Sequence, residues 1–224
     1  MGKVWQKNMK QAILERLQAL GGDISLVKGE SLAEDLCTIT FDTVLYKKPL
    51  WAPWMDENGE EPIDGLGDFL DANLTLYQAD KERFFQKLYE TYFILTEVPY
   101  GQYFWLGEMF TSFQEGTRDF EAWHRVFQGE VYSFEKIFSV IEANTTDLIH
   151  LFYGYGYPDG IYIASQDKNA DNPRVFATDH EAWFIEIDDE GDLASYLHSF
   201  WTKEELRAEI ESKLTLGHES IKKR

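Results

Sequence analysis

The chain has 224 residues, which is enough for one large domain or two small ones with a buried core. Its 21 basic and 40 acidic residues give a formal net charge of −19 at pH 7. This balance argues against nucleic acid and anionic membranes as partners, because both are bound through basic patches. The charge either keeps the protein soluble or forms an acidic face that steers and docks a basic protein.

Aromatic residues make up 16% of the chain and are spread along it, so we expect most of them to pack in a core. No apolar run reaches the roughly 18 residues of a membrane-spanning helix, and the amphipathic N-terminal pattern lacks the apolar stretch of a signal peptide. Cys37 is the only cysteine, which excludes a disulfide within the chain. We therefore expect a cytoplasmic protein.

The first half of the chain combines a helix, a strand and a long loop. Apolar residues at three- and four-residue spacings predict a helix over Val4–Leu20, which a pair of glycines ends. Alternation over Cys37–Leu45 predicts a half-buried strand, with Cys37 as a small core residue rather than a nucleophile. Residues 48–68 form a loop rich in proline and tryptophan, interpreted as an excursion from a single domain.

Local signals also define the elements of the second half, where Asp80 is placed to cap a helix that ends before Pro99. The patterns then predict a strand over Gln102–Phe110 and helices over Asp119–Gln128 and Phe134–Asn144. Three short strands followed by a helix are predicted within Asp147–Trp201. A C-terminal helix is predicted to begin with a capping box of Thr202 and Glu205 and to end near Gly217. Because helices and strands come in blocks rather than in strict alternation, we expect an α+β fold.

The residues that look most catalytic are Asp179 and His180. In a strand, His180 would point to the face opposite Asp179 and Glu181, which is a poor arrangement for three neighbours to close on one metal. We therefore expect Asp179 to hold a tight turn between two strands. The alternative is a hydrolase in which Asp179 and His180 serve as acid and base.

Sequence patterns for cofactors and metals fail when their structural context is considered. Gly154, Gly156 and Gly160 resemble a dinucleotide-binding loop, but a strand follows where phosphate binding needs a helix N-terminus. Turn glycines are the better interpretation. The acidic run at 56–65 does not satisfy the positions of an EF-hand loop, and the histidines lack metal-binding spacing. We expect neither a cofactor nor a metal.

Three stretches between Asp147 and Trp201 carry a family resemblance. The first stretch, Gly156–Ala164, is a glycine turn followed by a strand. The second, Pro173–Glu181, is a strand that ends in Asp-His-Glu, and the third is the segment Leu193–Leu197. In order and spacing they resemble the SMI1/KNR4 superfamily, also called SUKH. The family's earlier Leu-Pro motif has no match after the helical pattern at 135–142.

The resemblance implies a single α+β domain over residues 1–224, with a mostly antiparallel sheet packed by helices and no conserved catalytic set. Bacterial members of the family are regarded as immunity proteins that bind and neutralise toxins, many of them nucleases. Fungal members are regulatory proteins of cell-wall synthesis. The resemblance thus implies a protein-binding module and not an enzyme. We expect an immunity protein that occludes a basic toxin, with a regulatory scaffold as the alternative.

The predicted interface consists of acidic or aromatic loops that look exposed. Trp51 and Trp54 are flanked by prolines, and they either fold back onto the domain or anchor a partner. The predicted binding residues are Trp51, Trp54, Asp56, Tyr155, Tyr157, Asp159, Asp188, Asp189 and Glu190.

Overall fold

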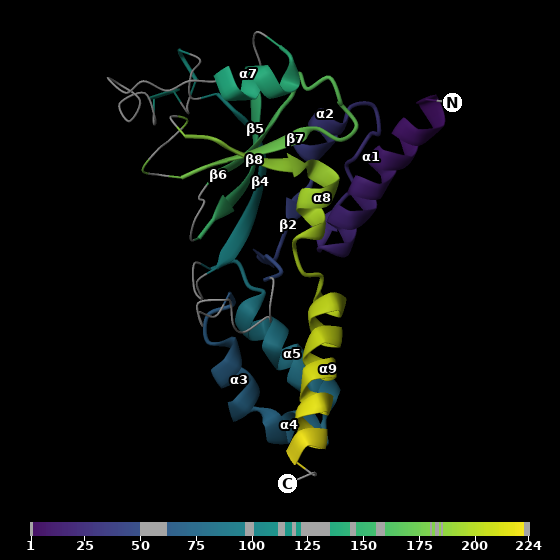
Figure 1. The fold of residues 1–224 in the computed structure, drawn as a ribbon, viewed down its shortest axis with the longest axis vertical. Helices are drawn as coiled ribbons and strands as arrows, with labels where there is room; N and C mark the ends of the chain where they lie inside the picture. Colours follow the sequence, from purple (N-terminus) through teal and green to yellow (C-terminus); the bar gives the residue numbers. More distant parts are fainter. Residues whose placement is uncertain are drawn as a thin grey trace. The chain divides into compact units, whose positions relative to one another are not determined.

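A computed structural model describes residues 2–49, 62–96, 101–111, 115–117, 120–121, 135–143, 147–155, 160–179, 181, 184 and 186–221. The fold combines helices with an antiparallel sheet, as expected for the α+β class (Figure 1). Packing divides the chain into two compact units: unit 1 is Met1–Phe41 with Phe104–His198, and unit 2 is Asp42–Tyr103 with Ser199–Arg224. The prediction of one family-like domain stays a prediction.

Unit 1 begins with helix α1, Gly2–Ala19, which confirms the helix predicted from the apolar spacing. Ile13 and Leu17 are buried on its inner face, whereas Met9, expected on the same face, is 40% exposed. The helix ends at Ala19, and the turn that follows includes Gly21, whose φ of 107° lies in the left-handed region that glycine adopts without a steric penalty. The side chain of Trp5 lies outside the described residues.

The strand predicted over Cys37–Leu45 is wrong. The segment instead begins at the residue that follows helix α2, Leu32–Leu36, and contains the two-residue strand β2, Thr40–Phe41, which pairs with β1, Gly22–Asp23. The hydroxyl of Ser31 caps α2, and Cys37 is the C-cap residue, exposed rather than in the core. Helix α2 has only five residues, too few for a helical periodicity to be recognised in the sequence. Its position is fixed by Leu32 and Leu36, which are buried in the structure.

The sheet of unit 1 has the strand order β4-β5-β6-β7-β8. Its strands are β4, Gln102–Phe110, which enters the unit at Phe104, then β5, Leu148–Gly154, β6, Gly160–Ala164, β7, Arg174–Thr178, and β8, Asp188–Asp192. The strands from β5 to β8 pair in an antiparallel manner. The predicted β4 is confirmed, and Gly154 and Gly160 lie at the facing ends of β5 and β6, as turn glycines do.

The sequence predicted three strands between Asp147 and Trp201, but the structure has a fourth, β8. Residues Asp188, Asp189 and Glu190, expected in an exposed loop, belong to this strand, and the first two pair with Ala177 and Phe176 of β7. Five polar or glycine residues have poor strand propensity, so the sequence gives no local signal for β8. Pairing with β7 supplies the missing stabilisation, and charged side chains are common on such edge strands.

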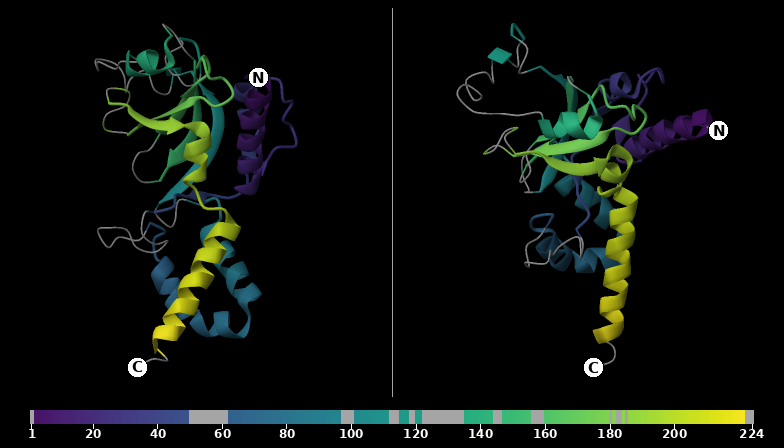
Figure 2. Two further views of the ribbon diagram at one scale, coloured as in Figure 1. Left: turned by 45° about the vertical axis from the view of Figure 1, so that its right-hand side comes forward. Right: turned by 45° about the horizontal axis from the view of Figure 1, so that its top comes forward.

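Helices pack on both faces of this sheet. Helix α7, Glu135–Ile141, confirms the predicted helix in that region, and its Ile137 and Ile141 join a buried cluster with Phe110, Tyr162 and Phe184. On the other face, α8, Leu193–His198, contacts both β7 and α1. Helices α8 and α1 lie side by side in Figures 1 and 2. The predicted helix over Asp119–Gln128 falls almost wholly outside the described residues.

Unit 2 is mostly helical and holds α3, Leu66–Ala72, α4, Leu74–Ala79, α5, Lys81–Tyr92, and α9, Lys203–Ile221, together with strand β3, Leu45–Tyr46. Strand β3 pairs with the first two residues of β4. The predicted caps are confirmed: Asp80 accepts the N–H of Arg83 at 3.1 Å, and Thr202 and Glu205 exchange two hydrogen bonds at the start of α9. Helix α9 continues past Gly217, where the sequence predicted its end.

Aromatic rings dominate the interior of unit 2, and cations of the same chain lie over several of them. Phe84 is fully buried and packs edge-on against Tyr77 and Phe85, with ring centroids 5.3 and 5.1 Å apart. Among the cation–ring pairs are Lys81 over Tyr77, Lys87 over Phe69, Lys203 over Tyr89 and Arg207 over Phe85. Across the described residues of both units, no helix has the length and apolar character needed to cross a bilayer.

Candidate functional site

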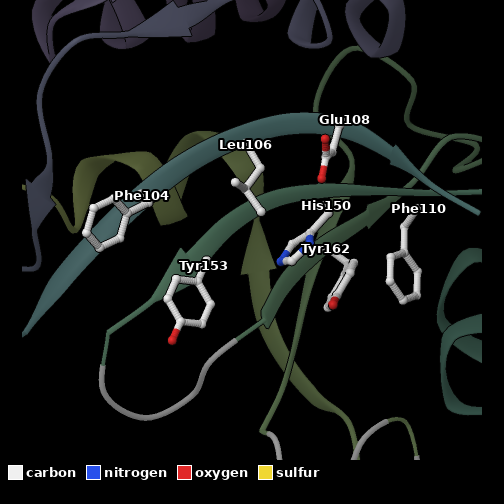
Figure 3. Close-up of a pocket in the computed structure, with 7 residues that line it drawn as sticks. All are labelled: Phe104, Leu106, Glu108, Phe110, His150, Tyr153 and Tyr162. Atoms are coloured by element: carbon white, nitrogen blue, oxygen red, sulfur yellow. The ribbon is translucent and has the colours of Figure 1, made fainter. Parts of the chain in front are cut away.

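One face of the sheet in unit 1 carries a hollow of about 390 Å³. Figure 3 shows that four alternate residues of β4 and three residues of the next two strands line it on the same side of the sheet. We call this hollow the β4 pocket. Its described lining consists of Phe104, Leu106, Glu108, Phe110, His150, Tyr153 and Tyr162.

The alternation of a strand explains how β4 builds one wall. Phe104, Leu106, Glu108 and Phe110 are two residues apart and therefore point to the same face. The residues between them serve the opposite face, where the indole N–H of Trp105 donates to the carbonyl of Ile39 at 2.9 Å. β4 thus holds its opposite face against the chain that follows α2 and turns the other face toward the pocket.

A stack of aromatic rings forms the floor of the β4 pocket. His150 lies directly opposite Tyr162 in the β5–β6 register, and their rings stack with centroids 4.4 Å apart and an interplanar angle of 20°. Phe110 contacts both rings, with centroid distances of 6.0 and 5.0 Å. Tyr162 and Phe110 are buried and also belong to the core cluster under α7. The floor is therefore fixed by core packing.

A β-bulge places Tyr153 in the pocket. The β5–β6 register shifts between His150 and Phe152, so one extra residue is accommodated in β5. Phe152 consequently faces the other side of the sheet, where its ring contacts Trp105 and Tyr196. Tyr153 then faces the pocket and lies 6.2 Å from Phe104, centroid to centroid, with the rings 35° from parallel.

The rim of the pocket is open and acidic. Leu106 is 37% exposed, and Glu108 is also exposed. Glu108 is the only Asp, Glu, Lys or Arg in the described lining, so the hollow presents aromatic walls with one negative charge. Such a site suits a group with an apolar stem and a positive end, because rings attract cations and the carboxylate pairs with them.

None of the predicted interface residues that the structure describes belongs to the described lining of the β4 pocket. Trp51, Trp54, Asp56, Tyr157 and Asp159 lie outside the described residues. The other predicted residues are described: Tyr155 follows the end of β5, and Asp188, Asp189 and Glu190 lie in β8.

Asp189 has a partner within its own unit. Both of its carboxylate oxygens accept from the guanidinium of Arg174 at 2.5 Å, so much of its charge is neutralised locally. Arg174 lies on β7, the strand that pairs with β8. Asp189 therefore contributes to holding the edge strand in place.

The turn predicted for Asp179 is confirmed, since its carboxylate accepts the backbone N–H of Glu181 at 2.6 Å. His180 lies outside the described residues. Within the part of the chain that the structure describes, no three or more histidine, cysteine, aspartate or glutamate side chains gather as metal ligands would.

A second hollow, of about 400 Å³, lies on the opposite face of the sheet and includes Cys37, Glu34 and Met109 in its lining. Although Cys37 as a whole is exposed, burial around the thiol raises its pKa, and the carboxylate of Glu108 raises the pKa further. The thiol therefore stays protonated at neutral pH, which makes it a poor nucleophile.

Sequence reasoning missed the β4 pocket, although part of its signal was present. The run Phe104–Phe110 places a glutamate among apolar residues on one face of a predicted strand. A charged residue at such a position indicates that this face of the strand is partly exposed to solvent. His150 and Tyr153 could not be assigned to the same face, because the bulge between them reverses the alternation.

In comparison with known proteins, no family model, no curated protein and no solved structure gives a significant match. The resemblance to the SMI1/KNR4 superfamily therefore stays a prediction.

Proposed function

We propose that this chain is a protein-binding module that docks a basic partner on the β4 face of unit 1 and performs no chemistry of its own. The observation that carries the proposal is the β4 pocket, an open hollow with aromatic walls and one carboxylate at its rim. Aromatic pockets of this kind receive the anchoring side chains that supply most of the binding energy at protein interfaces.

Charge supports a basic partner. The chain carries a formal charge of −19, so its field attracts positively charged proteins and accelerates their encounter. A basic partner also neutralises Glu108 on docking, whereas an acidic one would leave this carboxylate desolvated without compensation. A partner of opposite charge is therefore favoured both during the encounter and in the complex.

The family resemblance gives this binding a biological setting. We propose that the chain acts in the cytoplasm as an immunity protein, and that it covers the basic cleft of a toxin, such as a nuclease, so that substrate cannot enter. Occlusion requires only a complementary surface, so neither a cofactor nor a metal takes part. A regulatory scaffold would use the same surface on a different partner.

The proposal is tested with the protein encoded next to this chain in the genome. The two are co-expressed, purified together and examined by isothermal titration calorimetry, and growth is measured when the neighbour is expressed with and without this chain. A tight complex together with rescue of growth supports the proposal. If the neighbour is toxic and this chain neither binds it nor restores growth, the immunity assignment is wrong.

A further inference from the structure

Unit 2 shows how this chain accommodates a positively charged side chain on aromatic rings. The guanidinium carbon of Arg207 lies 4.6 Å from the ring centroid of Phe85. Its N–H groups are taken by the carboxylates of Glu82 and Glu211, and Glu82 receives two of these hydrogen bonds. A ring below the cation and carboxylates at its edge therefore hold an arginine within its own unit.

The β4 pocket in unit 1 has the same two components. Phe104 and Tyr153 provide ring faces near its mouth, Phe110 and Tyr162 provide rings at its floor, and Glu108 provides the carboxylate. The cation, which is the third component of the Arg207 site, is absent from the described lining of the β4 pocket, which includes no lysine or arginine. The pocket is thus composed like the Arg207 site without a cation of its own among those residues.

From this parallel we propose that the β4 pocket binds an arginine side chain of the partner protein. The guanidinium pairs with the carboxylate of Glu108 beside the rings at the floor, and the aliphatic stem covers Leu106, which lies between Glu108 and Phe104 on the same face of β4. Arginine fits better than lysine because its planar, weakly hydrated guanidinium stacks on rings and forms paired hydrogen bonds with a carboxylate. The inference names the anchor of the interface and rests on the proposed function.

The hollow is large enough to hold an arginine side chain. About 390 Å³ lies near the lower end of the roughly 300–1,000 Å³ typical of small-ligand sites. The floor residues are held by the core cluster under α7, so the site is formed before the ligand arrives and little ordering entropy is lost on binding. One anchoring side chain, surrounded by weaker contacts, is the usual design of an interface centre.

The test uses the full chain and a small probe. N-acetyl-arginine amide is titrated into isotopically labelled protein, and the NMR signals of the Leu106 methyl groups and the His150 ring are followed. N-acetyl-citrulline amide serves as the matched control, because it has nearly the same shape without the charge. We expect saturable shifts at millimolar arginine amide, concentrated on the β4 face, and at least several-fold weaker binding of the citrulline compound.

Two isosteric variants locate the site. Glu108→Gln removes the carboxylate at the rim and is expected to weaken binding of arginine amide about three- to tenfold. Glu34→Gln removes an exposed carboxylate beside the hollow on the opposite face and is expected to leave binding unchanged. Both positions are exposed, and circular dichroism confirms that each variant is folded. Equal binding of the two amides, or no effect of Glu108→Gln, would overturn the arginine assignment.

The outcomes separate this inference from the proposed function. If a toxin partner binds the wild type and Glu108→Gln equally well, the arginine pocket is wrong and the binding module stands. If arginine amide binds the β4 pocket but no toxin is bound or neutralised, the pocket stands and the immunity proposal is wrong.

Discussion

In unit 2, aromatic rings from α4 and α5 pack against one another, and lysine and arginine side chains of the same chain lie over them. In unit 1, the rings of the β4 pocket lie at an open surface beside Glu108, and their described lining includes no lysine or arginine. The same residue types thus build a closed interior in one unit and an accessible hollow in the other. Aromatic content alone therefore does not distinguish a buried core from an open hollow.

The largest difference between the two regions is expected in stability. Phe84→Ala in unit 2 removes a fully buried ring that packs against Phe69, Tyr77 and Phe85, and leaves a cavity. We expect the free energy of unfolding to fall by about 3–5 kcal/mol. Urea unfolding followed by circular dichroism measures the change. A loss below about 1 kcal/mol would show that the ring cluster does not hold unit 2 together.

Unit 1 also contains a buried carboxylate that stabilises the folded state, in contrast to the exposed carboxylate of Glu108. Asp35 is buried and accepts from the ammonium of Lys10 at 2.9 Å and from the backbone N–H groups of Lys28 and Gly29. Asp35→Asn leaves Lys10 without its counter-charge, and we expect a loss of about 3 kcal/mol. Glu15→Gln, at an exposed position of α1, is the control and is expected to change little.

The effect of Asp35 depends on pH in a defined direction. Burial acts to raise the pKa of its carboxyl, but the hydrogen bonds from Lys10, Lys28 and Gly29 outweigh burial and hold the pKa below its usual value. Its contribution is therefore present above the unfolded-state pKa of about 4 and is lost as pH falls below it. The gap between wild type and Asp35→Asn should narrow from pH 5 to pH 3. A gap that widens as pH falls would contradict this assignment.

A smaller effect is expected where unit 2 holds its own cation. Arg207→Gln removes the contact with Phe85 and the ion pairs with Glu82 and Glu211, and should cost about 1 kcal/mol. High salt should reduce the difference, since ion pairs at the surface are screened. Arg83→Gln on the exposed face of α5 removes the same charge elsewhere in the unit. If the free energy of unfolding falls by the same amount in both variants, the change in net charge and not the loss of the ring contact is responsible.

The smallest effect on stability is expected at the β4 pocket. Leu106→Ser changes a side chain that is 37% exposed, so the free energy of unfolding should fall by less than about 1 kcal/mol. Binding of arginine amide should weaken in the same variant, because the stem of the ligand loses its apolar contact. A loss of stability above about 2 kcal/mol would mean that this face is packed, and the contrast between the two units would disappear.

Local signals were reliable where hydrogen bonds between near neighbours decide the structure. The caps at Asp80 and Thr202, the glycine stop after α1 and the turn at Asp179 were all predicted, because each depends on residues a few positions apart. β4 was predicted from its composition and length. These elements need little help from the rest of the chain.

Three features could not be predicted because distant residues decide them. Strand β8 has an acidic sequence that gains its pairing and the Arg174 ion pair only from β7. Cys37 lies at the exposed end of α2 because Leu32 and Leu36 are buried there, not because of its own neighbours in an alternating pattern. The bulge in β5 exists only in the pairing with β6.

The sequence by itself determined an acidic, aromatic α+β protein and the positions of most of its helices, because charge is a sum and helix signals are local. Only the tertiary structure decided which aromatic residues became core and which became the wall of a pocket. Phe85 and Phe104 are the same residue type, but Arg207 lies over the ring of the first, while the second lines an open hollow beside Glu108. That outcome depends on strand register and packing, which no short stretch of sequence contains.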